Sequence, residues 1–173
     1  TLVRAMPAIL ECYPDAVLVL VGRGPCLYDA VKEANKLGVR NSVLFPGVVS
    51  NTELAGLYAA CELFALPTGA DTNGQVEGFG LVFTEAHAYG KPVVAGRSGG
   101  VVDAVTDGET GLIVEPDDPE ALAAAILSLM ADESLRSKLG QNGKKRVETE
   151  QNWAVFCTKL LCEFREKLDG PRP

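Results

Sequence analysis

The sequence contains no hydrophobic run that approaches the ~20 residues of a membrane-spanning helix, which argues against an integral membrane protein. It is also short of cations: 16 Lys and Arg residues stand against 23 Asp and Glu residues, for a formal net charge of −7. Binding to nucleic acid needs Lys and Arg gathered against phosphates, so this balance argues against a nucleic-acid-binding protein. The basic cluster at 144–146 lies among acidic residues and is expected on a solvated helix face.

The five cysteines are odd in number and form no C-x-x-C pair. This spacing argues against a disulfide framework and a zinc site, and it favours a reducing, cytoplasmic environment. Asp117 and Asp118 lie where a helix is expected to start, which favours capping over metal binding because no D-x-D motif accompanies them. We therefore expect neither a metal nor a cofactor.

Hydrophobic residues make up 47% of 173 residues, enough for one domain that buries ~70% of its unfolded surface. Apolar runs typical of buried strands alternate with helical patterns. Strands are expected within 16–22, 41–49, 63–67, 91–96 and 109–116. Helices are expected within 1–14, 25–39, 50–62, from about 80, within 99–108 and 117–132, then within 132–150 and 152–168. This alternation predicts an α/β fold with a Rossmann-like, doubly wound parallel sheet.

Several helix boundaries carry local signals. Ser50 and Glu53 have the spacing of a capping box, and Asp118 followed by Pro119 is typical of an N-cap and a first helical residue. Within 132–150, two glycines at 140 and 143 are expected to weaken the helix locally. The last helix is expected to be amphipathic, with one apolar stripe formed by Trp153, Phe156, Leu160 and Phe164.

In open α/β sheets, ligands bind beyond the carboxyl ends of the strands. The first loop there is "GRGP", in which Gly22 and Gly24 let the backbone approach a ligand and Arg23 brings a positive charge. The loop lacks the third glycine of a dinucleotide fingerprint, and a tight strand-to-helix turn explains it equally well. The loop "GRSGGV" at 96–101 has the same two interpretations, a set of ligand-facing amides or a turn.

The stretch "GQVEGFGLVFTEAHAYGKPVV" at 74–94 places Glu77 eight positions before Glu85. If a helix begins near Gly80, the amides of Phe79, Gly80 and Leu81 point out of its N-terminus and suit a phosphate. A carboxylate accepts hydrogen bonds, so Glu85 suits a diol such as a ribose. Glu77 would then face the group next to the phosphate.

Residues 77–126, beginning "EGFGLVFTEAHAYGKPVVAGRSGG", resemble the donor-binding half of family 4 retaining glycosyltransferases of GT-B fold. The segments "LVGRGP", "NSVLFPGVVSNTELAGLYAACELFALPT" and "LRSKLGQNGKKRV" and a Trp-led last helix fall in the order of that family. The form "VEGFGLVFTEA…GKPVVAGRSGG" is most similar to bacterial phosphatidylinositol mannosyltransferases, which use GDP-mannose. The resemblance covers nearly the whole chain.

The resemblance implies a role for each matching position. Glu77 and Glu85 match the E-x7-E motif, so Glu77 would be the catalytic residue next to the donor sugar and Glu85 would bind the ribose hydroxyls. The residues implied to meet the sugar and diphosphate are Gly78, Phe79, Gly80 and Leu81. The backbone of Val49 would pair with the nucleobase, and Gly22 and Gly24 would border the nucleotide pocket.

The resemblance also implies that residues 1–173 form a single nucleotide-sugar-binding domain, one half of a GT-B enzyme. The acceptor-binding domain, the first strand and an Arg–Lys pair that holds the diphosphate would precede Thr1. The chain alone is therefore expected to be inactive, with Arg23, Arg97 and Lys91 as partial substitutes. Its partners would be a nucleotide sugar and the acceptor domain, with self-association through exposed apolar surface. The full-length enzyme would act in the cytoplasm, at the inner face of the membrane.

The leading function is transfer of a hexose from GDP-mannose or a UDP-sugar to a lipid or saccharide. The alternatives are a non-catalytic nucleotide-sugar-binding module and a nucleotide-sugar epimerase of the same fold, while a dehydrogenase lacks its glycine fingerprint. His87 is expected either as a partly buried helix residue or in proton transfer, and Tyr28 and Tyr89 as packing residues. Gly80→Val is expected to crowd the diphosphate and leave the fold intact.

Overall fold

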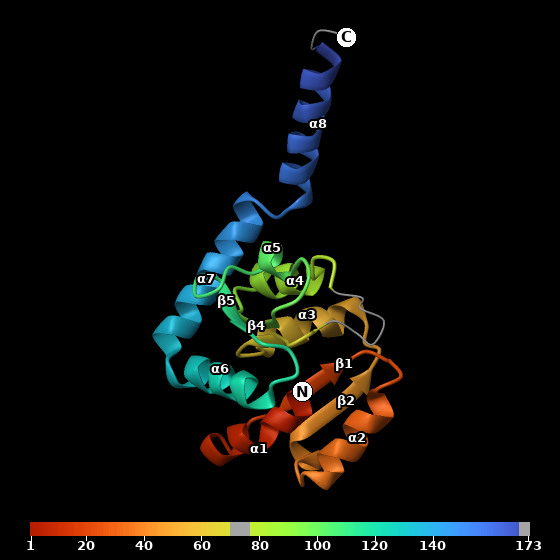
Figure 1. Ribbon diagram of the computed structural model, residues 1–173, viewed down its shortest axis with the longest axis vertical. Helices are drawn as coiled ribbons and strands as arrows, with labels where there is room; N and C mark the ends of the chain where they lie inside the picture. Colours follow the sequence, from red (N-terminus) through yellow and green to blue (C-terminus); the bar gives the residue numbers. More distant parts are fainter. Residues whose placement is uncertain (70–76, 170–173) are drawn as a thin grey trace.

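The computed structural model describes residues 1–69 and 77–169. Its described strands lie in two parallel sheets with helices packed against them (Figure 1). The strands are β1 (Leu18–Val21) paired with β2 (Val43–Gly47), and β4 (Val93–Gly96) between β3 (Phe64–Leu66) and β5 (Gly111–Val114). The expected α/β class with parallel strands is confirmed, and the structure adds that the strands form a pair and a triplet.

Helices alternate with these strands in the predicted order. They are α1 (Leu2–Cys12), α2 (Leu27–Lys36), α3 (Asn51–Ala60), α4 (Leu81–Ala88), α5 (Val101–Ala104), α6 (Pro119–Ala131), α7 (Glu133–Thr149) and α8 (Trp153–Asp169), with a 3-10 turn at Arg40–Ser42. Ser50 and Glu53 exchange the two hydrogen bonds of a capping box at α3. Asp118 caps α6, and Pro119 is its first residue. Both boundary predictions are confirmed.

The larger hydrophobic core extends across both sheets. α1 and α6 pack side by side (Figure 1) and contribute Met6 and Leu122, while Val43 of β2 and Val94 of β4 belong to the same core. A second core lies beneath α4 and α5, with Phe83 fully buried. Burying a side chain of this size stabilises the fold by about 1.5–3 kcal/mol. The pair and the triplet of strands therefore belong to one folded body.

β1 and β3 each pair along one edge only within the part of the chain that the structure describes. The run 16–22 predicted a strand buried on both faces, yet Val17 and Val21 are 56% and 42% exposed. β4 differs from β1: it has a neighbouring strand on each edge, and all its residues are buried. The prediction of full burial is wrong for β1, in which Leu18, Val19 and Leu20 are half-buried and Val21 is exposed.

α7 is continuous across the two glycines that were expected to weaken it. Gly143 lies where α7 packs against α4, and a Cβ on it would overlap the imidazole ring of His87. Glycine inside a helix costs about 1 kcal/mol relative to alanine. Here the small residue allows two helices to meet, so packing between α4 and α7 offsets that cost.

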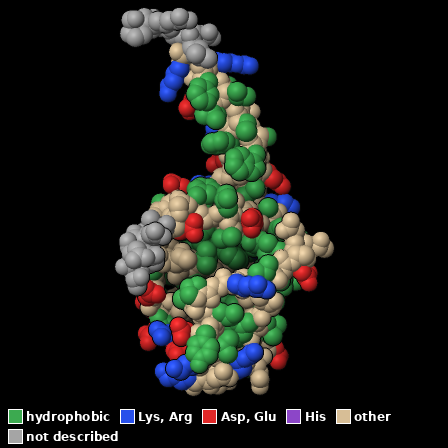
Figure 2. Space-filling view, turned by 90° about the vertical axis from the view of Figure 1, so that its right-hand side faces the viewer, with side chains coloured by type: hydrophobic (Ala, Val, Ile, Leu, Met, Phe, Trp, Pro, Cys, Tyr) green, Lys and Arg blue, Asp and Glu red, His purple; other side chains and the backbone are tan. Residues whose placement is uncertain are grey.

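α8 extends away from the rest of the molecule, and apolar side chains line it (Figures 1 and 2). The expected stripe is exposed, with Trp153 at 74% and Leu160 at 40%. The described part of the chain includes no helix with both the length and the apolar character needed to cross a bilayer.

Candidate functional site

The predicted ligand loops are joined in two pairs by backbone hydrogen bonds. After β1, the amide of Gly22 donates to the carbonyl of Gly47 at the end of β2, at 2.8 Å. Before α4, the carbonyl of Glu77 accepts from the amide of Gly100 in the loop after β4, at 3.0 Å. Figure 2 views the molecule from the side to which β1 and β2 point in Figure 1, and hydrophobic side chains surround a hollow there. Each glycine loop is therefore fixed to a second predicted loop.

Glu77 caps the N-terminus of α4. Its Oε1 accepts a hydrogen bond from the amide of Gly80 at 3.1 Å. A negative charge at this end of a helix is favourable by about 0.3–1 kcal/mol. The sequence predicted that this amide would serve a phosphate, whereas the carboxylate of Glu77 binds it in the structure. Glu77 thus occupies part of the expected anion site.

Gly80 is required by the fold as well as by the expected site. It precedes α4 in a left-handed conformation with φ of 79°, and a Cβ on it would lie 2.5 Å from the ring of Phe83. The expectation that Gly80→Val leaves the fold intact is therefore wrong, because Phe83 is fully buried and cannot yield. Gly78 is exposed, and a Cβ on it would meet nothing within 4 Å among the residues that the structure describes.

Leu81 and Glu85 are four residues apart on α4 and share its exposed face. The hydroxyl of Tyr58, on α3, donates to Oε2 of Glu85 at 3.0 Å. Burial raises the pKa of Tyr58, and the hydrogen bond to Glu85 raises it further, so the phenol remains a donor. Sequence reasoning missed Tyr58, since the two residues are 27 positions apart and no local pattern links them.

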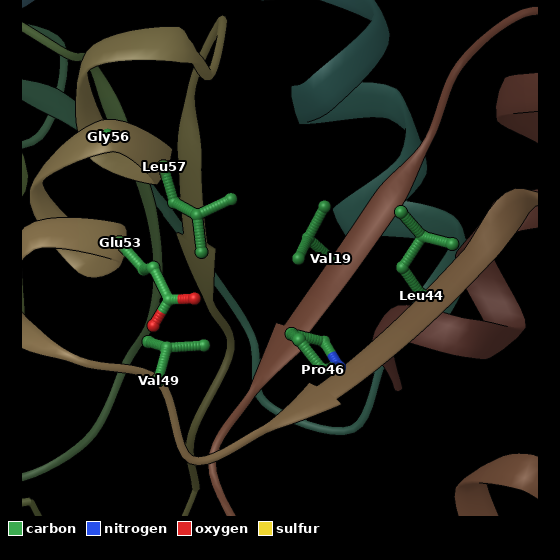
Figure 3. A pocket seen from close by; sticks show the side chains of 7 residues that line it. All are labelled: Val19, Leu44, Pro46, Val49, Glu53, Gly56 and Leu57. Carbon is green, nitrogen blue, oxygen red and sulfur yellow. The ribbon is translucent and has the colours of Figure 1, made fainter.

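A cavity of about 360 Å³ lies between the β1–β2 pair and α3. Figure 3 shows side chains from the two strands facing those of Val49 and α3 across the opening. The residues that line it are Val19, Leu44, Pro46, Val49, Glu53, Gly56 and Leu57. Hydrogen bonds from the backbone and hydroxyl of Ser50 hold the pKa of Glu53 below its usual value. The volume is within the range of small-molecule pockets, and Val49, expected beside a nucleobase, forms part of its wall.

The three cations expected to replace a missing phosphate clamp lie in different places. Arg97, after β4, forms an ion pair with Glu115 at 2.8 Å. Lys91 precedes β4 and borders a groove with Glu62 and Arg136 at the opposite end of that strand. The expectation for Lys91 is therefore wrong. Arg23 is exposed in the loop after β1, as a ligand contact requires.

The structure decides the expectations for His87, Tyr28 and Tyr89, with a different outcome for each tyrosine. His87 is fully buried, and its Nε2 lies 3.0 Å from the carbonyl oxygen of Thr110. A buried ring does not reach a substrate, so proton transfer to a ligand is excluded. Tyr89 stacks on Tyr58 with ring centroids 5.7 Å apart, as a packing residue. Tyr28 is 75% exposed, so its assignment to packing is wrong.

Both residues of the acidic pair after β5 have hydrogen-bond partners within the protein. Asp118 accepts from the amides at the start of α6, and Asp117 accepts from the hydroxyl of Thr1 at 3.2 Å. Within residues 1–69 and 77–169, no three His, Cys, Asp or Glu side chains gather as metal ligands would. All five cysteines are free.

The arrangement of these loops and helices is that of a GT-B glycosyltransferase. Sucrose-phosphate synthase from Thermosynechococcus elongatus aligns with a TM-score of 0.76 and 31% identity, over 96% of this chain and 42% of that one. HepE from Anabaena, in complex with UDP, aligns with a TM-score of 0.79 and 27% identity, over 95% of this chain and 44% of that one.

Residues 1–146 match the family of glycosyl transferases group 1, and the chain belongs to that family. A GDP-mannose-dependent alpha-(1-6)-phosphatidylinositol monomannoside mannosyltransferase from Mycolicibacterium smegmatis is 38% identical over 172 residues. That match covers 99% of this chain and 44% of the relative. The predicted resemblance is confirmed, and the chain spans less than half the length of the curated relatives that it matches.

Proposed function

We propose that residues 1–173 bind the donor substrate of a retaining glycosyltransferase, which transfers a hexose to a lipid or saccharide. The proposal rests on Glu77 at the N-terminus of α4 and Glu85 one turn along its exposed face. GDP-mannose is the first candidate donor, because the mannosyltransferase relatives are named as dependent on it. A UDP-sugar is the second, because HepE was solved with UDP-glucose.

The chemistry of the reaction suits the N-terminus of α4. Transfer from a nucleotide sugar breaks the anomeric C–O bond through an oxocarbenium-like state. Negative charge then develops on the diphosphate, and the helix dipole and the amides of Phe79 and Leu81 stabilise it, since Glu77 already holds the amide of Gly80. The carboxylate of Glu77 stabilises the positive charge on the sugar. Retention follows when the acceptor attacks the face from which the diphosphate departs, without a sugar bound covalently to Glu77.

The rest of the nucleotide is assigned along α3. The cavity beside Val49 takes the base, and the backbone of Val49 pairs with its edge. Glu85 accepts hydrogen bonds from the ribose diol. Gly22 and Gly24 do not line this cavity. Their loop, which is bonded to Gly47 after β2, is assigned to the border of the nucleotide.

A parallel strand from outside residues 1–173 is proposed to lie between β1 and β3. Both strands have an edge without a described partner, and one core spans both sheets. The hydroxyl of Thr1 bonds to Asp117 in the loop after β5, so α1 begins at the carboxyl end of the triplet. A strand that ends there and continues through α1 into β1 forms a β–α–β unit, the usual connection between parallel strands. The same outside region supplies the acceptor site, so residues 1–173 alone bind donor without transferring it.

Glu85→Ala is expected to weaken nucleotide binding about tenfold, the value of a hydrogen bond to a charged group. Isothermal titration with GDP, UDP and ADP, and then with the corresponding nucleotide sugars, measures the affinity. Wild type is expected to bind the nucleotide of one base saturably. The matched control is Glu148→Ala, since Glu148 is exposed on α7. Unchanged affinity in Glu85→Ala contradicts the ribose assignment.

If residues 1–173 bind no nucleotide, the titration is repeated on a chain that continues before Thr1. Binding by the longer chain alone means that the preceding segment supplies the phosphate clamp. Absence of binding by both chains overturns the proposed function. Binding without transfer, even after the acceptor domain is added, identifies a non-catalytic module instead.

We propose that the full-length enzyme acts in the cytoplasm, at the inner face of the membrane.

The exposed stripe of α8 is proposed to pack against the acceptor domain of that enzyme. Without the acceptor domain, residues 1–173 are expected to self-associate, because exposed apolar patches of this kind promote association. Sedimentation velocity over a concentration series tests this. The double variant Phe156→Glu, Phe164→Glu is expected to remain monomeric, whereas Thr158→Glu, on the opposite face of α8, is expected to self-associate like wild type. A wild-type chain that stays monomeric contradicts the proposal.

A further inference from the structure

We propose that Tyr58 is a positioning residue that orients the carboxylate of Glu85 and thereby sets selectivity for a ribose over a sugar without the diol. The inference rests on the proposed function and assigns a role to a residue outside the E-x7-E motif. Its basis is the 3.0 Å hydrogen bond from the Tyr58 hydroxyl to Oε2 of Glu85.

The ring of Tyr58 is fixed by its surroundings. Only 7% of the residue is exposed. Tyr89 stacks on one side with planes 20° apart, and Phe64 packs at 54° with its centroid 5.8 Å away. The hydroxyl is therefore held at one place on the border between α3 and α4.

Glu85 is exposed on α4, and an exposed glutamate samples several rotamers. The bond from Tyr58 holds its Oε2 toward α3. A carboxylate has two oxygens with about four acceptor sites, so Oε1 and the second lone pair of Oε2 remain for a ligand. Two neighbouring hydroxyls of a ribose match this pair of acceptors. Tyr58 thus fixes the plane in which the diol is accepted.

α3 connects the two ends of the proposed nucleotide site. Leu57 and Glu53 line the cavity assigned to the base, and Tyr58, next to Leu57, holds Glu85. One rigid helix therefore sets the separation between the base cavity and the carboxylate that meets the ribose. A nucleoside whose base fills the cavity would place its sugar relative to a carboxylate that is already oriented.

Tyr58→Phe keeps the buried ring and removes only the hydroxyl. The test measures dissociation constants for GDP, or for whichever nucleoside diphosphate wild type prefers, and for its 2′,3′-dideoxy analogue. It uses residues 1–173 or the longer chain, whichever binds. Wild type is expected to prefer the ribonucleotide. Tyr58→Phe is expected to lose about fivefold in ribonucleotide affinity while dideoxynucleotide affinity stays unchanged. Adding Tyr58→Phe to Glu85→Ala is expected to cause no further loss.

Tyr89→Phe is the matched control, because it removes a hydroxyl from the stacked neighbour that has no bond to Glu85 among the described contacts. It is expected to bind both nucleotides like wild type. An equal loss for both nucleotides in Tyr58→Phe, or an unchanged preference, overturns the positioning role while leaving the proposed function in place. Failure of wild type to bind any nucleoside diphosphate, in either chain, overturns the proposed function and this assignment with it.

Discussion

Gly80→Val is expected to lower the free energy of unfolding by roughly 2–5 kcal/mol and to remove nucleotide binding. Valine in the left-handed conformation of Gly80, with φ of 79°, costs about 1–2 kcal/mol. Its Cβ would also press on the buried ring of Phe83, and overpacking of this kind costs about 1–3 kcal/mol more. Domains are stable by only about 5–15 kcal/mol, so urea unfolding should detect the loss easily.

Gly78→Val tests the assigned diphosphate site without the loss of stability expected for Gly80→Val. Gly78 is exposed and has room for a side chain among the described residues, so its variant should unfold at the same urea concentration as wild type. It should still lose nucleotide affinity, because the new side chain enters the space assigned to the diphosphate. Wild-type stability in Gly80→Val contradicts the packing argument. Wild-type nucleotide affinity in a stable Gly78→Val means that the diphosphate lies elsewhere.

Much of the fold could be predicted because its signals are local. The capping box at Ser50 and Glu53 and the start of α6 at Asp118 depend on neighbours within three residues, and both were predicted correctly. The helix that begins after Gly80 follows the same logic. Short apolar runs bounded by glycine and proline located the strands. Alternation of these elements was then sufficient to predict the α/β class.

The features that could not be predicted depend on contacts between distant residues. The bond from Tyr58 to Glu85 joins two helices, and the packing of His87 depends on Gly143 in a third. The hydrogen bond from the Gly80 amide to Glu77 joins residues only three positions apart, but sequence reasoning assigned the carboxylate of Glu77 to a ligand. Sequence reasoning therefore placed the two carboxylates of the motif correctly on α4 and its entry loop. It did not find the protein groups that already bind them.

His87 shows how burial changes a residue whose type suggests chemistry. Its ring is covered by Gly143 of α7, its Nε2 faces the carbonyl of Thr110, and Nδ1 has no partner among the described residues. A carbonyl only accepts, so Nε2 carries the proton of the neutral ring. A second proton on Nδ1 would place a buried charge near Arg146 without an acceptor. Burial holds the pKa of His87 below its usual value; the hydrogen bond to Thr110 opposes this shift, and the charge of Arg146 adds a smaller lowering.

The stability of the fold is therefore expected to fall when the pH drops from 7 to 5.5. An unfolded histidine takes up a proton near pH 6.5, whereas folded His87 resists it, so the unfolded state binds more protons below that pH. Stability is complete above about pH 6.5 and decreases by up to about 1.4 kcal/mol per pH unit below it, until the folded pKa is reached. Urea unfolding at pH 7, 6.5, 6 and 5.5 measures the slope.

His87→Gln is the control, because glutamine can donate to the carbonyl of Thr110 but does not titrate. The chain has a single histidine, so this variant removes the whole histidine contribution. The amine of Thr1, whose pKa burial also lowers, remains in both proteins and cancels in the comparison. Equal slopes for wild type and His87→Gln contradict a depressed pKa. A flatter slope in the variant means that the single histidine, two residues after Glu85 on α4, accounts for the loss of wild-type stability in acid.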